Sequence, residues 1–312
     1  MKWLQYFRLK AIAILVRVFG TWMMSGAVKR DLLHEKDTKP QRIQIPSRDP
    51  GRSIKCLLYA PPDSKKTKKE KTPVLVNWHG SGFVVPGLGM DHAYCARVAR
   101  EAGIAVLDAD YRKGPETCYP GPLEDAEDVL RWIVRQPGEF DVSRVAVSGF
   151  SAGGTLALAS ATSLRQSLPS GMNIPIVVAV YPLTDFTFGP AERRIDKPID
   201  PVPHSMLSVF SECYAPDPAI RTDPRVSPGR ADPASFPDTV VIIAASGDTL
   251  SPEAEILAAQ LKNDGKRRVV SLTLEDAGHG FDKGPVRGSK KWEQREKAYS
   301  LIVRTIRESF HL

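Results

Sequence analysis

Residues 145–155 constrain the fold of this chain more than any other stretch. The β-branched and apolar run 144–147 predicts a buried strand, and the alanine- and leucine-rich run 155–163 predicts a helix. Between them lie residues 149–153, G-F-S-A-G, which form a G-x-S-x-G pattern. A serine between a strand and a helix stands on a tight turn, with its hydroxyl exposed at the carboxyl edge of the sheet. The segment therefore predicts Ser151 as a nucleophile.

Strands and helices alternate through most of the remaining sequence. A buried strand is predicted at residues 73–78, and further strands are predicted at residues 104–108, 176–180, 239–245 and 268–274. Helices are predicted at residues 93–102, 122–134, 252–263 and 291–309. Residues 42–60 alternate as a β-hairpin, and we interpret the Pro- and Asp-rich stretch 185–238 as an insertion that partly covers the site. The alternation, with its short connections, predicts an α/β fold with a mostly parallel central sheet and helices on both faces.

The composition describes a globular chain whose positive charge has a local origin. Of the 312 residues, 42% are hydrophobic and 25% are charged, as is usual for globular proteins. The net charge is +7, of which residues 65–71 contribute +4, from five lysines less Glu70, so that +3 is left for the rest. We interpret this lysine run as a solvated loop. The sequence has no basic stripe with interleaved aromatic residues, which argues against a nucleic-acid partner.

The four cysteines form no recognisable metal or disulfide pattern. They are widely spaced and include no C-x-x-C pair: Cys56, Cys95, Cys118 and Cys213. We therefore expect free thiols, no bound metal, and a reducing compartment, the cytoplasm.

Residues 1–28 predict an amphipathic helix. Apolar side chains recur at helical spacing, at Trp3, Phe7, Ala11, Ile14, Leu15, Val18 and Trp22. Lys10, Arg17 and Thr21 lie on the opposite side. Arg17 interrupts the apolar run that a signal peptide or a spanning helix requires. Two interpretations remain: the stripe packs on the protein's own domain as a lid, which we favour, or it makes peripheral contact with a membrane surface.

Two further polar residues follow predicted strands. Asp248 and His279 each come after a strand of the sheet, so that Ser151, Asp248 and His279 share its carboxyl edge in this chain order. A histidine can take the proton of the serine hydroxyl, and an aspartate can fix the tautomer of the imidazole. Glu275 is nearer to His279 in sequence, but closeness along the chain does not place a carboxylate behind the ring.

A glycine-rich turn follows the predicted strand 73–78. Residues 79–82 read H-G-S-G, and backbone amides of such a turn can point at a developing oxyanion. The amide of Ala152, at the start of the helix after Ser151, can join them.

These motifs together resemble the hormone-sensitive-lipase-like (bacterial type IV) carboxylesterases of the α/β-hydrolase fold. The resemblance covers roughly residues 74–305 and is more specific than any single motif. It rests on residues 79–83 (HGSGF), 110–112 (DYR) with 115–116 (PE), 119–120 (YP) with 123–125 (LED), 149–154 (GFSAGG), 181–182 (YP), 248–250 (DTL) and 278–281 (GHGF).

The resemblance implies an α/β-hydrolase fold with a helical cap over an acyl pocket. On this basis we divide the chain into an N-terminal helical cap or anchor segment, residues 1–40, and a catalytic domain, residues 41–312. Residues 185–225 are the expected cap insertion. The sequence does not distinguish a monomer from a dimer.

The resemblance also implies a serine hydrolase that cleaves small-molecule carboxylic esters through an acyl-enzyme intermediate, without a cofactor or metal. The implied triad is Ser151, His279 and Asp248. The implied oxyanion amides are those of Ser81, Gly82 and Ala152, with Gly80 setting the turn.

The chain departs from the family pattern at several positions around the site. Ser81 stands where the family usually has glycine, so a backbone angle that serine disfavours is a concern there. Phe150 replaces the usual Asp or Thr, Pro252 replaces a second acid, and residues 113–114 (KG) replace Leu-Ala. An amidase, a formamidase or a sugar deacetylase would use the same triad, and receptors of this fold bind ligands without turnover. His279 is present here, which favours catalysis over the receptor function.

Overall fold

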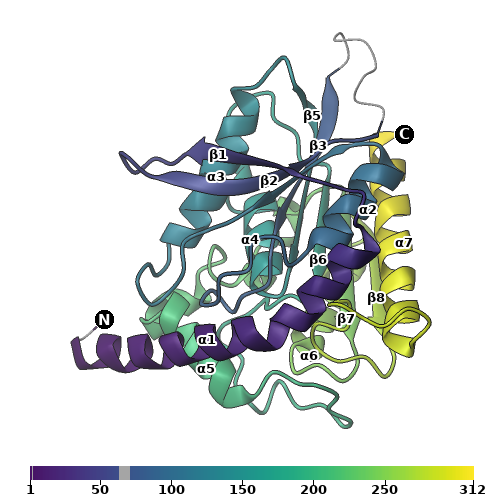
Figure 1. Ribbon diagram of the computed structural model, residues 1–312. Helices are drawn as coiled ribbons and strands as arrows, with labels where there is room; N and C mark the ends of the chain where they lie inside the picture. Colours follow the sequence, from purple (N-terminus) through teal and green to yellow (C-terminus); the bar gives the residue numbers. More distant parts are fainter. Residues whose placement is uncertain (2, 63–70) are drawn as a thin grey trace.

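Eight strands form one central sheet in the computed structural model, which describes residues 1, 3–62 and 71–312 (Figure 1). The predicted lysine loop lies outside the described residues, apart from Lys71. Across the sheet the strands follow the order β1-β2-β4-β3-β5-β6-β7-β8. Their bounds are β1 Gln41–Pro46, β2 Ser53–Tyr59, β3 Thr72–Trp78, β4 Ala105–Ala109, β5 Phe140–Phe150, β6 Ile176–Val180, β7 Thr239–Ala245 and β8 Arg268–Leu274.

Most strands of this sheet run parallel. β4, β3, β5, β6, β7 and β8 are parallel neighbours, and the hairpin of β1 and β2 adds antiparallel strands at one edge. Because parallel strands end at the same edge of a sheet, the segments after β3, β5, β7 and β8 meet there.

Helices cover both faces of the sheet (Figure 1). The helices α3, α4 and α6 share one hydrophobic core with the sheet, and α2 and α7 share a second core on the other face. Their bounds are α2 His92–Ala102, α3 Gly121–Val134, α4 Ala152–Ala161, α6 Ser251–Asp264 and α7 Lys290–Phe310. The predicted α/β architecture, with a mostly parallel sheet between two helical layers, is confirmed.

The predicted bounds differ from the structure where polar residues or glycines at the start of an element interrupt its apolar pattern. The strands β6, β7 and β8 have the predicted bounds: β6 and β7 are buried apolar runs, whereas β8 is a partly buried strand at the edge of the sheet. β5 begins at Phe140, earlier than predicted. Its first half is only partly buried and carries polar residues, so the apolar pattern does not reveal it. α4 begins at Ala152, and not at residue 155, since glycines at its start lower the helix propensity that the pattern reveals.

The stretch 185–238 contains one α-helix, α5 (His204–Tyr214), and several short 3₁₀ turns. α5 lies against the turn after β3: a Cβ on Gly82 would lie 2.4 Å from the ring of Phe210. The phenyl ring of Phe83, in the same turn, stacks on Tyr214 with 3.8 Å between ring centroids. This packing agrees with the expected cover over the site, while the division into cap and catalytic domain stays a prediction.

The N-terminal residues form one long helix, α1 (Trp3–His34), which lies along the outside of the molecule (Figure 1). Leu9 and Ala13 are fully buried and pack against Val209 and Phe210 of α5. Among the described residues, no single helix has the length and apolar composition to cross a membrane. Only the two parts of α1, residues 3–22 and 24–34, which meet at a bend of 40°, meet these two requirements as a pair.

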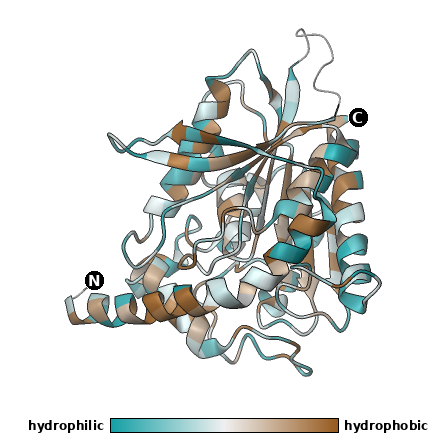
Figure 2. Ribbon diagram, in the orientation of Figure 1, coloured by the Kyte–Doolittle hydropathy of each residue, from teal (hydrophilic) through white to brown (hydrophobic). Residues whose placement is uncertain are grey.

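The orientation of α1 is opposite to the one we expected for a lid. The apolar stripe faces outward, with Trp3 79%, Leu15 70% and Trp22 71% exposed, and Figure 2 shows hydrophobic residues along this helix. The expectation that the stripe packs on the domain is therefore wrong. The side chain of Arg17, expected on the solvent side, instead turns inward to Glu116. The physical reason is that the domain offers carboxylates and carbonyls to this helix more than it offers an apolar groove.

Candidate active site

Ser151 occupies a one-residue turn between β5 and α4. Its backbone φ is +52°, a left-handed angle that is strained for a residue other than glycine. The neighbouring backbone approaches so closely that a Cβ on Gly149 would lie 2.1 Å from the carbonyl oxygen of Gly153. A Cβ on Gly153 would lie 1.9 Å from the carbonyl oxygen of Trp78 in β3. The two glycines of the G-x-S-x-G pattern therefore permit the turn that presents Ser151.

The structure brings Ser151, His279 and Asp248 into one hydrogen-bonded line. His279 Nε2 lies 3.1 Å from Ser151 Oγ, and His279 Nδ1 lies 2.7 Å from Asp248 Oδ2. Asp248 is fully buried and also accepts a hydrogen bond from the backbone N–H of Leu250, at 3.2 Å. The imidazole is partly exposed, at 19% of its side chain. This arrangement can move a proton from the serine hydroxyl to the imidazole while the carboxylate stabilises the resulting charge.

Glu275, the acid nearest to His279 in sequence, lies elsewhere. It is exposed, and its backbone carbonyl accepts a hydrogen bond of 2.8 Å from Gln294 Nε2. The ring nitrogen Nδ1 of His279 is paired with Asp248 instead.

The turn after β3 lies beside Ser151. A Cβ on Gly80 would be 3.3 Å from Ser151 Cβ. The absence of a side chain at Gly80 therefore lets the backbone of this turn lie close to Ser151. The left-handed angles of the turn fall on Gly82 (φ +56°) and Phe83 (φ +61°), and Ser81 has no such angle. The strain that the family comparison suggested for Ser81 is therefore absent. Within the described residues, no hydrogen bond uses the N–H groups of Ser81, Gly82 or Ala152, which leaves these donors for an anion.

Tyr111 is a residue of this site whose role the sequence did not reveal, although it belongs to the DYR motif. Its hydroxyl donates to the backbone carbonyl of His79 at 2.7 Å and lies 2.6 Å from Ser81 Oγ. Ser81 Oγ in turn accepts a hydrogen bond of 2.9 Å from the N–H of Phe83. The phenol and the serine hydroxyl thus fix the backbone of the turn from both ends.

The buried imidazole of His79 packs against Tyr111 and so supports the same turn. It is fully buried, stacks on Tyr111 at 4.8 Å between centroids, and places Nε2 3.2 Å from Asp110 Oδ1. Burial lowers the pKa of His79. Lys113 donates to Asp110 Oδ1 at 2.8 Å and lies 3.5 Å from the centroid of the Tyr111 ring. Burial lowers the pKa of Lys113 to about 8, although Asp110 favours its charged form.

A second tyrosine positions the loop that carries His279. The ring centroid of Tyr181 lies 4.7 Å from that of His279, and its hydroxyl donates to Asp282 Oδ1 at 2.6 Å. Lys283 donates to Asp282 Oδ2 at 2.8 Å and to Asp91 Oδ1 at 2.5 Å. This buried polar network holds the loop between β8 and α7, since breaking one partner would leave a buried charge uncompensated.

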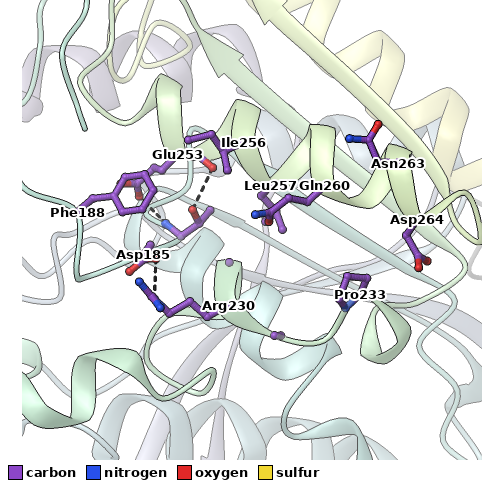
Figure 3. A pocket seen from close by; sticks show the side chains of 13 residues that line it. Asp185, Phe188, Arg230, Pro233, Glu253, Ile256, Leu257, Gln260, Asn263 and Asp264 are labelled. Carbon is purple, nitrogen blue, oxygen red and sulfur yellow. Dashed lines mark hydrogen bonds and ion pairs between the residues drawn. The ribbon is translucent and has the colours of Figure 1, made fainter. Parts of the chain in front are cut away.

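A separate cavity of about 790 Å³ lies beside α6 (Figure 3). Its lining includes Asp185, Arg230 and Glu253, and it contains none of Ser151, Asp248 and His279. These three lining side chains are already paired: Arg230 Nε lies 2.8 Å from Asp185 Oδ2, and Glu253 accepts from the backbone N–H of Thr184 at 2.6 Å. In the described part of the chain, no three His, Cys, Asp or Glu side chains are arranged to hold a metal ion.

Comparisons with known proteins identify the family of this chain. A family model described as alpha/beta hydrolase fold matches residues 75–283. Ethyl acetate hydrolase of Pseudomonas putida is 31% identical over 228 residues, which cover 72% of this chain and 70% of that protein. Esterase LipI of Mycobacterium tuberculosis is 33% identical over 220 residues, which cover 67% of each.

A similar arrangement is found in a solved structure. The esterase of Pyrobaculum calidifontis superposes with a TM-score of 0.79 at 27% identity, over 95% of this chain and 92% of that one. The family match spans the strands and loops that carry Ser151, Asp248 and His279. The chain therefore belongs to the α/β-hydrolase family, among the carboxylesterases that resemble hormone-sensitive lipase.

Proposed function

We propose that this chain is a serine hydrolase that cleaves carboxylic esters through an acyl-enzyme intermediate on Ser151. The observation that carries the proposal is the line of hydrogen-bond distances from Ser151 Oγ to His279 and from His279 to Asp248, 3.1 Å and 2.7 Å. The names of two relatives, ethyl acetate hydrolase and esterase LipI, both refer to the hydrolysis of esters.

In the first half of the reaction, His279 Nε2 takes the proton of Ser151 while Oγ attacks the ester carbonyl. The bond between the carbonyl carbon and the alkoxy oxygen then breaks, and His279 gives its proton to the departing alcohol. In the second half, His279 takes a proton from water, the hydroxide attacks the acyl-enzyme, and the proton returns to Ser151 as the acid leaves. Asp248 stabilises the imidazolium in both halves.

The tetrahedral intermediates carry a negative charge on the former carbonyl oxygen. The N–H groups of Ser81, Gly82 and Ala152 are the proposed donors to that oxygen, because they make no other hydrogen bond among the described residues and belong to the two turns beside Ser151. Gly80 allows the turn to approach Ser151.

The test combines kinetics with covalent labelling. Ser151→Ala is expected to lower the turnover of p-nitrophenyl acetate by several orders of magnitude and leave folding intact, because little packing is lost. A serine-reactive phosphonate is expected to label Ser151 in the unaltered protein. Labelling that persists in Ser151→Ala would exclude this nucleophile, and a protein that shows neither a burst nor turnover of the ester would be a ligand-binding member of the fold.

The preference for esters over amides is tested by the same assay with other leaving groups. A formamidase, an amidase or a sugar deacetylase would use the same residues, so a profile of acyl lengths and leaving groups decides the substrate class.

The proposed place of action is a reducing compartment, the cytoplasm. All four cysteines are free, and Cys56, Cys95 and Cys213 are buried, where burial raises the thiol pKa and keeps these groups unreactive.

A further inference from the structure

The outer face of α1 carries an unusual concentration of apolar side chains. We define this outer face as Trp3, Leu4, Phe7, Ile14, Leu15, Val18, Phe19 and Trp22, which are between 49% and 87% exposed. These eight belong to the fourteen exposed large hydrophobic side chains of the described residues. Their neighbours lie three, four or seven residues apart along the helix, and they therefore form one stripe on it. A contiguous apolar patch of this kind marks an interaction surface.

The helix cannot bury this stripe by rotation, because its other side is fixed to the domain. In its first half, Arg17 donates to the carbonyl oxygens of Val84 at 3.0 Å and Gly114 at 2.8 Å, and also to Glu116 at 2.6 Å. Arg8, the residue before Leu9, pairs with Glu212 of α5. Turning the helix outward side in would break these contacts.

The second half of α1 is fixed just as firmly. Asp31 is buried, accepts from the N–H of Gly284 at 2.7 Å and pairs with Arg295 of α7 at 2.6 Å. The helix approaches the loop so closely at this point that a Cβ on Gly284 would lie 2.4 Å from Ala27 Cα.

The charge of the segment identifies what covers the outer face. Residues 1–30 contain six basic residues and no acidic residue, and the first acid of the chain is Asp31. Arg8 pairs with Glu212, and Lys10 and Arg17 pair with Glu116, whereas Lys29 and Arg30 are exposed. A second copy of the chain would bring two such basic helices together, which is electrostatically unfavourable, whereas an anionic lipid surface attracts them.

The part of α1 from Gly20 to Lys29 borders a basic groove. A cavity of about 800 Å³ lies between α1 and the hairpin of β1 and β2, and Lys29, Arg42 and Lys55 line it. Asp110 also lines this groove, where Lys113 neutralises it at 2.8 Å. Tryptophans stand near both ends of the stripe, at Trp3 and Trp22, and an indole ring is well suited to the boundary between lipid headgroups and acyl chains.

We propose that the outer face of α1 inserts into the surface of an anionic lipid membrane, with the helix lying flat and its inner side still bound to the domain. The helix keeps its contacts with Glu116, Glu212 and Arg295, so that it acts as a peripheral anchor and does not cross the bilayer. This proposal is independent of the function proposed for Ser151.

The test is co-sedimentation of the full-length protein with vesicles of phosphatidylcholine alone or mixed with phosphatidylserine. The unaltered chain is expected to pellet with the mixed vesicles and to be released by high salt. The variant Leu15→Glu/Val18→Glu is expected to bind at least about tenfold more weakly, because two apolar side chains that insert into the lipid are replaced by carboxylates that do not. The control Ile256→Glu/Val286→Glu places the same charges at exposed apolar positions of α6 and the loop before α7, and it is expected to bind like the unaltered chain.

Hydrolysis of p-nitrophenyl acetate and the circular dichroism spectrum of each variant report folding separately from lipid binding. A chain that stays in the supernatant with mixed vesicles would overturn the proposal, as would equal binding by the outer-face variant and the control. A dimer in sedimentation analysis that the outer-face variant converts to a monomer, without vesicle binding by the unaltered chain, would assign the stripe to self-association instead.

Discussion

The hydroxyl of Ser81 lies 2.6 Å from the phenol oxygen of Tyr111. Since Tyr111 donates to the carbonyl of His79 and Phe83 donates to Ser81, the proton between the two hydroxyls belongs to Ser81. Ser81 stands where the family usually has glycine, and its hydroxyl makes hydrogen bonds that a glycine could not make. Its side chain joins Tyr111 to the backbone that carries the proposed oxyanion donors.

This relationship changes what a substitution at Ser81 is expected to do. The sequence alone suggests that Ser81→Gly is mild or even activating, because the amide is retained and a strained angle is relieved. In the structure Ser81 has no left-handed angle, and its hydroxyl makes two hydrogen bonds. We expect Ser81→Gly and Ser81→Ala each to lower kcat for p-nitrophenyl acetate about fivefold or more, with little change in KM, since one buried hydrogen bond is worth about 1 kcal/mol.

The matched experiment is a double-mutant cycle with Tyr111→Phe. If the two hydroxyls act as one unit, the double variant Ser81→Ala/Tyr111→Phe loses less activity than the sum of the single losses. Additive losses would show that the two hydroxyls act separately.

The second prediction distinguishes the two acids near His279. Asp248→Asn is expected to lower kcat by about 10⁴-fold, because an amide holds the imidazole in the wrong tautomer. Glu275→Gln is the control and is expected to retain nearly full activity, since its side chain is exposed and Nδ1 is paired with Asp248. A larger loss in Glu275→Gln than in Asp248→Asn would contradict the assignment.

The third prediction concerns the close packing under Ser151. Gly153→Ala is expected to destabilise the fold by about 2 kcal/mol or more and to abolish esterase activity, because the new Cβ would lie 1.9 Å from the carbonyl oxygen of Trp78. Gly138→Ala makes the same chemical change where nothing lies within 4 Å of the new Cβ. Equal unfolding midpoints in urea for the two variants would show that β3 and α4 can separate without cost.

The fourth prediction concerns the pH dependence of α1 docking. Partial burial opposes ionisation of Glu116, but hydrogen bonds from Arg17 and Lys10 outweigh it and lower the pKa of Glu116 to about 2. Because the folded pKa is below the ordinary value of 4.5, the stabilisation is fully present above pH 4.5 and is lost as the pH falls through about 2. We therefore expect amide hydrogen exchange in α1 to accelerate across this interval.

The variant Glu116→Gln removes this pH dependence and is expected to exchange faster in the first half of α1 already at neutral pH. Asp141→Asn is the control, because Asp141 pairs at 2.6 Å with Arg144 of its own strand, β5. If exchange in α1 has the same pH profile in both variants, Glu116 does not hold the helix.

Much of the fold was predictable because the central strands are nearly continuous apolar runs, as in β6 and β7. The resemblance to hormone-sensitive-lipase-like carboxylesterases is confirmed by the comparisons, and the structure places Ser151, His279 and Asp248 in contact. Their catalytic roles stay predictions. The links through Tyr111 and Tyr181 were not predictable, since a side-chain hydrogen bond depends on the distance between loops that the sequence separates.

The orientation of α1 was not predictable for a related reason. Helical spacing tells which residues share a face, but not which face turns toward the protein. That choice depended on Glu116 and Arg295, which lie far along the chain from Arg17 and Asp31.

The anchorage of α1 also determines when this helix can be completed during synthesis. Asp31 and Arg295 are separated by 264 positions, so α1 finds this partner only when α7 has been translated. Until then the carboxylate of Asp31 lacks the guanidinium that compensates its charge in the folded protein. Docking of the second half of α1 is consequently expected among the last steps that complete the domain.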